Sequence, residues 1–200
     1  MIVRYSNFME IDPQEPIIAE GNKLLIPEGK PKQTREAFFR IMEDRVQRLD
    51  KNSYSSVAGY GSVFAHFSSI TYKIPEGKLV EDASIYINED DFRLYGEDFT
   101  DLIPIAVRHE IFEMWVYSKN GWSLSPVPKR IGKENRVELA HNLALREEYR
   151  FAFEIGKADR YWEFMRRYSQ KLPESAQTKF LQENERAFLK AKSWNTRQRK

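Results

Sequence analysis

Apolar side chains recur at helical spacing in four segments of the second half of the chain. These segments are residues 101–119, 134–155, 158–172 and 174–194. In each of them apolar positions repeat every three or four residues, which is typical of a helix with a buried face. The segment 101–119 carries apolar side chains on two sides, so we expect this helix to be buried on most of its surface. Gly156 and Pro173 are the expected helix ends.

The pattern changes in the region 54–88, where short runs of β-branched and aromatic residues favour strands. The runs are residues 63–67, 70–74 and 84–87, and the segment 75–78 has the composition of a turn between strands. We therefore expect a small antiparallel sheet of two to four strands in this region.

The segment before the expected sheet divides into two parts. Proline and glycine interrupt residues 1–33, which predicts an irregular lead-in. A helix is expected from Thr34 to about Asp50, because Phe38, Met42, Val46 and Leu49 recur at helical spacing. The fold class is thus α+β, with a small antiparallel sheet in the N-terminal half followed by a bundle of about four helices. We expect one domain over residues 1–200 with a basic tail at 194–200.

Composition limits the chemistry that the chain can support. The 200 residues include no cysteine, which excludes disulfides, thiolate zinc sites and cysteine nucleophiles. Any metal must therefore be held by histidine, aspartate, glutamate or water. No apolar stretch approaches the roughly 20 residues that cross a bilayer, and the first residues do not have the pattern of a signal peptide. The expected location is the cytoplasm.

Charge is distributed unevenly along the chain. Residues 1–100 sum to −5 and residues 101–200 to +7, although the net charge is only +2. No acidic residue follows Glu185, whereas basic residues continue to the end of the sequence. A polyanion could contact this region through Lys190, Lys192, Arg197, Arg199 and Lys200. The alternative is a solvated, frayed terminus.

One motif on the expected helix 101–119 indicates site chemistry. His109 and Glu113 are four residues apart, so they project from the same face of a helix, and Glu110 borders that face. Charged side chains on an otherwise apolar helix are costly to bury without compensation. A metal ion would provide that compensation.

The run His109-Glu110-x-x-Glu113 resembles the helix of zincin metallopeptidases, in which His-Glu-x-x-His supplies two zinc ligands and a general base. The resemblance implies a zinc-dependent peptidase, with His109 as a ligand and Glu110 as the base that activates water. Glu113 stands where the family has its second histidine, so the match departs from the family there. An edge strand flanks the cleft of zincins and receives an extended peptide, and the strand 84–87 is the expected counterpart.

A further metal ligand must come from another element. The expected helix 134–155 offers His141, our first choice, and Glu138 as an alternative ligand. Glu148 lies about 10 Å along the helix axis from His141, which is too far for both to bind one ion directly. We therefore expect Glu148 to support a ligand or an arginine from outside the coordination shell.

Other interpretations remain open for the same residues. His109 and Glu113 could form an ordinary hydrogen-bonded pair, and His141 could be a core histidine. The chain would then be a non-catalytic interaction or nucleic-acid-associated protein that uses its basic last helix. A two-metal carboxylate bundle would need Glu-x-x-His on two helices, and only Glu138 to His141 supplies it. His66 is expected on the solvent side of a strand.

Overall fold

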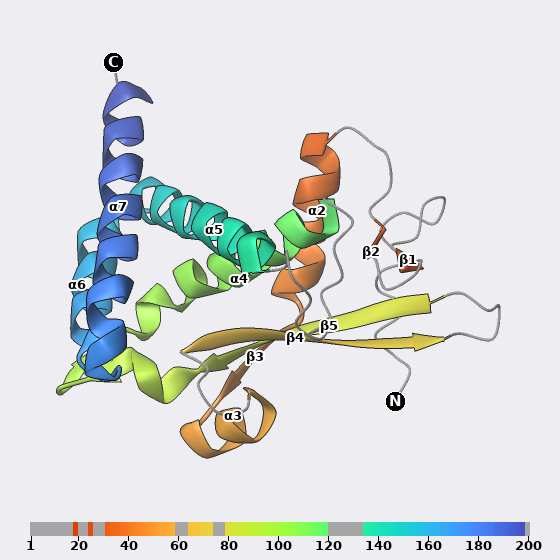
Figure 1. Cartoon of the computed structure of the whole chain (residues 1–200), viewed down its shortest axis with the longest axis horizontal. Coiled ribbons are helices and arrows are strands. Elements are labelled where there is room, and N and C mark those ends of the chain that lie inside the picture. The colour runs from red at the N-terminus through yellow and green to blue at the C-terminus, as the bar shows by residue number, and fades with distance from the viewer. Residues whose placement is uncertain are drawn as a thin grey trace.

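A computed structural model of the chain describes residues 18–19, 24–25, 31–58, 64–73, 79–119 and 134–198. In these residues the helices are α2 (Pro31–Glu43), α3 (Lys51–Ala58), α4 (Ile103–Lys119), α5 (Glu134–Glu154), α6 (Ala158–Ser169) and α7 (Glu174–Gln198). The strands are β1 (Ile18–Ala19), β2 (Leu24–Leu25), β3 (Val46–Leu49), β4 (Ala65–Lys73), β5 (Leu79–Asn88), β6 (Arg93–Leu94) and β7 (Glu97–Asp98). Helices α4 and α5 lie on one side of the two long strands and α3 lies on the other (Figure 1). The α+β class is confirmed.

Strand β5 lies in the interior of the main sheet. It pairs antiparallel with β4 along nine residues, from Ala65 opposite Ile87 to Lys73 opposite Leu79. On its other side β5 pairs with β3 in parallel and with β1 in antiparallel orientation. The sheet is therefore mixed, and the expectation of a purely antiparallel sheet is wrong for β3. The expected edge strand 84–87 is also interior, whereas β4 has β5 as its one strand partner among the described residues.

The first helix is shorter than its apolar spacing predicts. Helix α2 begins at Pro31 and ends at Glu43, so Val46 and Leu49 belong to β3 and not to the helix. The reversal occurs at Arg45, whose carbonyl accepts the N–H of Ile85 and whose guanidinium donates to the carbonyl of Ala83. Because β5 offers unsatisfied backbone groups at this point, strand pairing replaces the last helical turn.

The region that begins at Tyr54 is helical and not β, since α3 precedes the strands. Asp50 caps this helix, with its carboxylate accepting the N–H groups of Asn52 and Ser53 at 2.9 and 3.0 Å. Among residues 51–57 of α3, Tyr54 is the buried one. The two expected strands 63–67 and 70–74 fall on the single strand β4, of which the structure describes residues 65–73. The expected turn 75–78 lies outside the described residues.

The later helices match the periodicity of the sequence closely. Helix α4 follows a short 3-10 turn, Thr100–Leu102, and accommodates Pro104 in its first turn. Gly156 ends α5 with a φ of 72°, and the N–H of Lys157 returns to the carbonyl of Ala152 at 2.8 Å. Asn120 and Gly121, which follow α4 in the sequence, lie outside the described residues.

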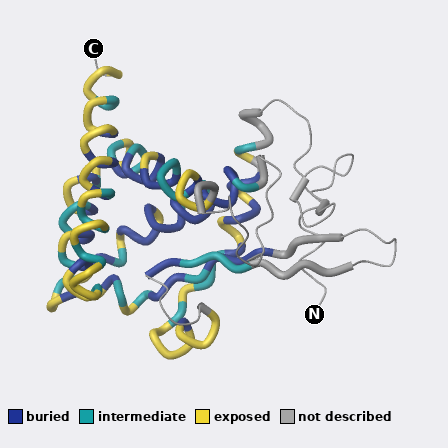
Figure 2. Tube along the Cα trace, in the orientation of Figure 1, coloured by how far each residue is buried: buried dark blue, intermediate teal, exposed yellow. Residues whose placement is uncertain are grey.

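Aromatic rings join the sheet to the helical part of the molecule. Phe64, at the start of β4, contacts Phe92, Phe164 and Tyr168 edge-on, with ring centroids 4.8–5.4 Å apart. These rings belong to a hydrophobic core that also includes the inner faces of α4, α5 and α7. Figure 2 shows buried residues along α4, which lies between α5 and the two long strands. This core fixes α4 and α5 relative to the sheet.

The end of the chain is helical further than expected. Helix α7 continues to Gln198, and Trp194 packs under the guanidinium of Arg150 at 4.1 Å. The expected tail 194–200 is thus largely the last turn of α7, and most of the expected lead-in 1–33 lies outside the described residues. In the part of the chain that the structure describes, no helix has the length and apolar character needed to cross a membrane.

Candidate metal centre

Helices α4 and α5 pack side by side and bury five ionisable side chains between apolar neighbours. Three come from α4 and two from α5, and each residue is at most 9% exposed: His109, Glu110, Glu113, Glu147 and Glu148. Four carboxyl groups and one imidazole in a buried layer would be costly without partners or a cation. The partners therefore decide what this layer does.

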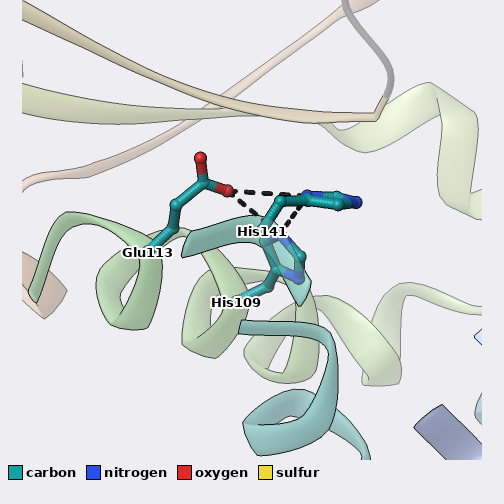
Figure 3. A group of neighbouring side chains, drawn as sticks. All are labelled: His109, Glu113 and His141. Atoms are coloured by element: carbon teal, nitrogen blue, oxygen red, sulfur yellow. Dashed lines mark hydrogen bonds and ion pairs between the residues drawn. The ribbon is translucent and has the colours of Figure 1, made fainter. Parts of the chain in front are cut away.

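Three of the expected ligand atoms converge on one point. His109 Nε2 lies 3.4 Å from Glu113 Oε2 and 3.2 Å from His141 Nδ1, and Glu113 Oε2 lies 3.6 Å from His141 Nδ1. Figure 3 shows these three side chains turned toward one another, two from α4 and one from α5. We call these three atoms the donor triangle.

The size of the donor triangle matches tetrahedral coordination. Zinc binds imidazole nitrogen and carboxylate oxygen at about 2.0–2.2 Å, so two corners of such a tetrahedron are roughly 3.4 Å apart. The three measured separations, 3.2, 3.4 and 3.6 Å, bracket this value. One point about 2.1 Å from all three atoms therefore exists without a change of rotamer.

Glu148 orients the imidazole of His109. Its Oε2 lies 2.5 Å from His109 Nδ1, on the side of the ring opposite the donor triangle. A carboxylate at Nδ1 accepts the Nδ1 proton, which leaves a lone pair on Nε2. The expectation that Glu148 supports a ligand from outside the donor triangle agrees with this contact.

Protons alone leave one edge of the donor triangle without a hydrogen bond. An imidazolium at His109 can donate its Nε2 proton to Glu113, and His141 can donate an Nδ1 proton to the same carboxylate. The two imidazole nitrogens, 3.2 Å apart, then face each other with a proton on each. A cation at the centre would satisfy all three donors at once, and it would offset the charge of the surrounding carboxylates.

The ionisable groups shift one another's pKa values in the metal-free protein. Burial lowers the pKa of His109, but the charge of Glu148 and hydrogen bonds with Glu113 and Glu148 outweigh it and raise the pKa well above its ordinary value. Burial raises the pKa of Glu113, yet hydrogen bonds from His109 and His141 outweigh this and lower the pKa to about 2. Without metal, the pair thus favours an imidazolium beside a carboxylate.

Glu110 lies beside the donor triangle and does not contribute a corner to it. Burial raises its pKa to about 8, while the charge of His109 and a hydrogen bond from the backbone of Phe67 act in the opposite direction. A carboxyl group with a pKa near neutrality is suited to accepting and releasing protons. The contact with Phe67 also places Glu110 against strand β4.

The remaining candidate residues lie apart from the donor triangle. Glu138 is exposed on α5. Its carboxylate does not belong to the group of ligand atoms that the described residues bring together. His66 is half-buried in β4, and burial lowers its pKa, so it is less exposed than the expected solvent-side position implies. Phe67, next to it, packs against the core and stacks on the His66 ring, which explains the partial burial.

The sequence did not reveal a second set of contacts beside the centre. Arg108 donates to Glu147 at 2.8 Å, and Arg35 from α2 pairs with the same oxygen. Both guanidinium groups also lie over the ring of Phe39. Successive residues of α4, Arg108 and His109, thus pair with successive residues of α5, Glu147 and Glu148. Two adjacent basic residues on α4 and two adjacent acidic residues on α5 were the sequence feature that could have predicted these contacts.

The three residues of the donor triangle differ in exposure. The side chains of His109 and Glu113 are 10% and 12% exposed, whereas that of His141 is 44% exposed. His141 is therefore the residue of the donor triangle that has most contact with solvent, while the other two are covered. Comparison with family models, with curated proteins and with solved structures finds no match to this chain.

Proposed function

We propose that the chain is a metal-dependent hydrolase that holds one divalent ion, zinc, between α4 and α5. The observation that carries the proposal is the donor triangle, whose edges of 3.2–3.6 Å fit a tetrahedral ion. Its ligands are His109, Glu113 and His141. Two histidines and one carboxylate form a common ligand set of catalytic zinc sites, in which the fourth position is open to water or substrate.

A zinc ion held by these residues would supply Lewis acidity for the activation of water and of a carbonyl oxygen. The residues of the chain supply orientation and proton transfer. Glu148 holds the Nδ1 proton of His109 and so keeps Nε2 available as a donor. Glu110 is the proposed general base, because it lies next to His109 on α4 and its pKa is raised to about 8 by burial.

The arrangement of β4 supports a peptide substrate. The carbonyl of Phe64 accepts the N–H of Asn88, so the even-numbered residues of β4 direct their backbone groups to β5. By alternation Phe67 and the other odd-numbered residues direct theirs to the open edge. Since the backbone of Phe67 contacts the buried carboxyl group of Glu110, the proposed base lies at this edge and occupies it at Phe67. An extended peptide that added to β4 would have to take the place of Glu110 at this hydrogen bond.

The first test is metal content. Protein purified without added metal and without chelator is analysed by mass spectrometry of the elements, and apo protein is titrated with zinc. We expect one zinc per chain, and no binding in either measurement would rule out the metal site. The variant His66→Ala should bind as much zinc as the wild type, because it removes the third histidine without touching the donor triangle.

The second test separates metal binding from chemistry. Glu110→Gln keeps the ligands, and an amide does not accept a proton, so the variant should bind zinc normally but cleave quenched fluorescent peptides about 10²–10⁴-fold more slowly. Glu138→Gln, an exposed carboxyl on α5, should cleave them at the wild-type rate. Stoichiometric zinc without cleavage of any peptide in a mixed library would reject the peptidase part of the proposal and keep the metal site.

The absence of cysteine accords with a reducing compartment, so a cytoplasmic location is part of the proposal. The two-metal alternative loses support because Glu138 is exposed.

A further inference from the structure

The last two turns of α7 extend beyond the packed part of the molecule. Ala191 is the last buried residue of this helix, and no residue from 192 to 198 is buried. Figures 1 and 2 show this end of α7 projecting past α5 and α6 with an exposed surface. Such a segment contributes little to the core, so its side chains are available to a partner.

Three basic side chains form a stripe along the outer face of α7 that leads into this projecting segment. Arg186, Lys190 and Arg197 are exposed, and at 100° per residue they lie within about 40° of one another around the helix axis. They span eleven residues, roughly 16 Å. We call these three residues the basic stripe.

The basic stripe is not neutralised within the described part of the chain. None of its three residues forms an ion pair there, whereas Lys179, further back on α7, lies 3.7 Å from Glu183. No acidic residue follows Glu185 in the sequence. Lys192 points away from the basic stripe, with its ammonium group 5.8 Å from the ring of Phe188. Exposed positive charge without internal partners favours an external polyanion.

The neighbouring side chains distinguish among polyanions. A helix that binds a lipid surface needs an apolar face to insert between the lipids. Between residues 186 and 198 the exposed large apolar side chain is that of Leu189 alone, and the ring of Trp194 is covered by Arg150. The exposed Ser193 lies on the same side of the helix as the basic stripe, and a hydroxyl group beside cations is typical of contacts with a sugar-phosphate backbone.

We propose that the basic stripe of α7 binds the phosphate backbone of double-stranded nucleic acid without reading its sequence. A 16 Å stripe covers about five base-pair steps of 3.4 Å, which allows each of its three cations to meet a different phosphate. This contact is separate from the metal centre and does not depend on the proposed hydrolase activity.

The test is fluorescence anisotropy with a labelled 20-base-pair DNA duplex between 50 and 200 mM salt. The triple variant Arg186→Gln, Lys190→Gln, Arg197→Gln should bind at least about 10-fold more weakly at 50 mM salt. Its slope of log affinity against log salt should be smaller by about 2.7, because each of the three phosphates that the variant no longer neutralises accounts for about 0.9. The matched control removes three exposed cations from other elements, Arg48→Gln, Lys51→Gln and Arg93→Gln, and should keep the wild-type affinity and slope.

Circular dichroism and the melting temperature check that both triple variants fold. Each binding curve is measured with untreated and with EDTA-treated protein, so that loss of metal is distinguished from loss of the basic stripe. Failure of the wild type to bind at 50 mM salt, or equal weakening in both triple variants, would overturn the proposal. Binding to phosphatidylserine vesicles but not to duplex would also overturn it, in favour of a lipid surface.

Discussion

Glu148 Oε2 lies 2.5 Å from His109 Nδ1, and this contact joins the centres of α5 and α4 beneath the donor triangle. It places a carboxylate on the one imidazole nitrogen that does not face His141. The tautomer of His109 is therefore fixed by a residue that lies seven positions from His141 along the same helix. Metal affinity should depend on Glu148 although Glu148 is not a ligand.

We expect Glu148→Gln to weaken zinc binding by about 10–100-fold, because an amide holds the Nδ1 proton less strongly than a carboxylate does. Competition with a fluorescent chelator measures the change. Glu147→Gln is the matched control, since it makes the same substitution one residue away and Glu147 contacts arginines and not His109. If both variants weakened zinc equally, the effect would come from a general loosening of α5.

His109→Ala and His141→Ala should each lose zinc and the stability that zinc provides. Zinc at 100 times its dissociation constant should stabilise the wild type by about 2.7 kcal/mol, and neither variant should show this gain. Chemical denaturation with and without zinc measures it. His66→Ala should gain as much as the wild type, and an equal gain in His141→Ala would remove His141 from the ligand set.

The metal-free protein should lose stability as the pH rises from about 5 to 8. The pKa of Glu110 is raised to about 8 by burial, so the folded state retains a proton that the unfolded state releases near pH 4.5. The retained proton therefore stabilises the folded state fully below about pH 4.5. This contribution to the free energy of unfolding is lost as the pH rises through 8, with a limiting slope of about 1.4 kcal/mol per pH unit. Urea denaturation across this range should show a shallower fall in Glu110→Gln. The raised pKa of His109 acts in the same direction, so some fall should remain.

The buried contact between α5 and α7 should carry measurable stability. Tyr149 donates to Asn184 Oδ1 at 3.0 Å, and both residues are at most 2% exposed. Tyr149→Phe leaves the amide oxygen without its donor and should cost about 1–3 kcal/mol of unfolding free energy. Tyr95→Phe, at a residue that is 64% exposed, should change the free energy by less than about 0.5 kcal/mol.

Two truncations of α7 should distinguish the contribution of Trp194 to stability from that of the residues after it. Removal of residues 195–200 should leave the melting temperature nearly unchanged, because these residues bury no apolar side chain. Removal from residue 194 onward also deletes the ring under Arg150 and should cost about 0.5–2 kcal/mol. Thermal unfolding of both truncated chains checks this, and equal melting temperatures would mean that the stacked pair contributes nothing.

Local periodicity predicted most of the helices and part of the centre. The face shared by His109 and Glu113 follows from helical geometry alone, and His141 lay on the next helix as expected. Strand β3 was missed because Val46 and Leu49 satisfy helical spacing equally well, and only the distant β5 decides between the two structures. The same reason applies to Arg108 and Glu147, whose pairing depends on how α4 packs against α5. Spacing within one helix does not define that packing, and only a comparison of the charge order on both helices could have suggested the pair.

The unequal exposure of the three donors has a kinetic consequence. His109 and Glu113 are covered by the packed helices, while 44% of the His141 side chain is open to solvent. An ion held there would enter and leave through rotation of a single imidazole at the surface, a local motion that is far less costly than global unfolding. Exchange with a chelator should then proceed from the native state, at a rate that urea below the unfolding transition leaves nearly unchanged.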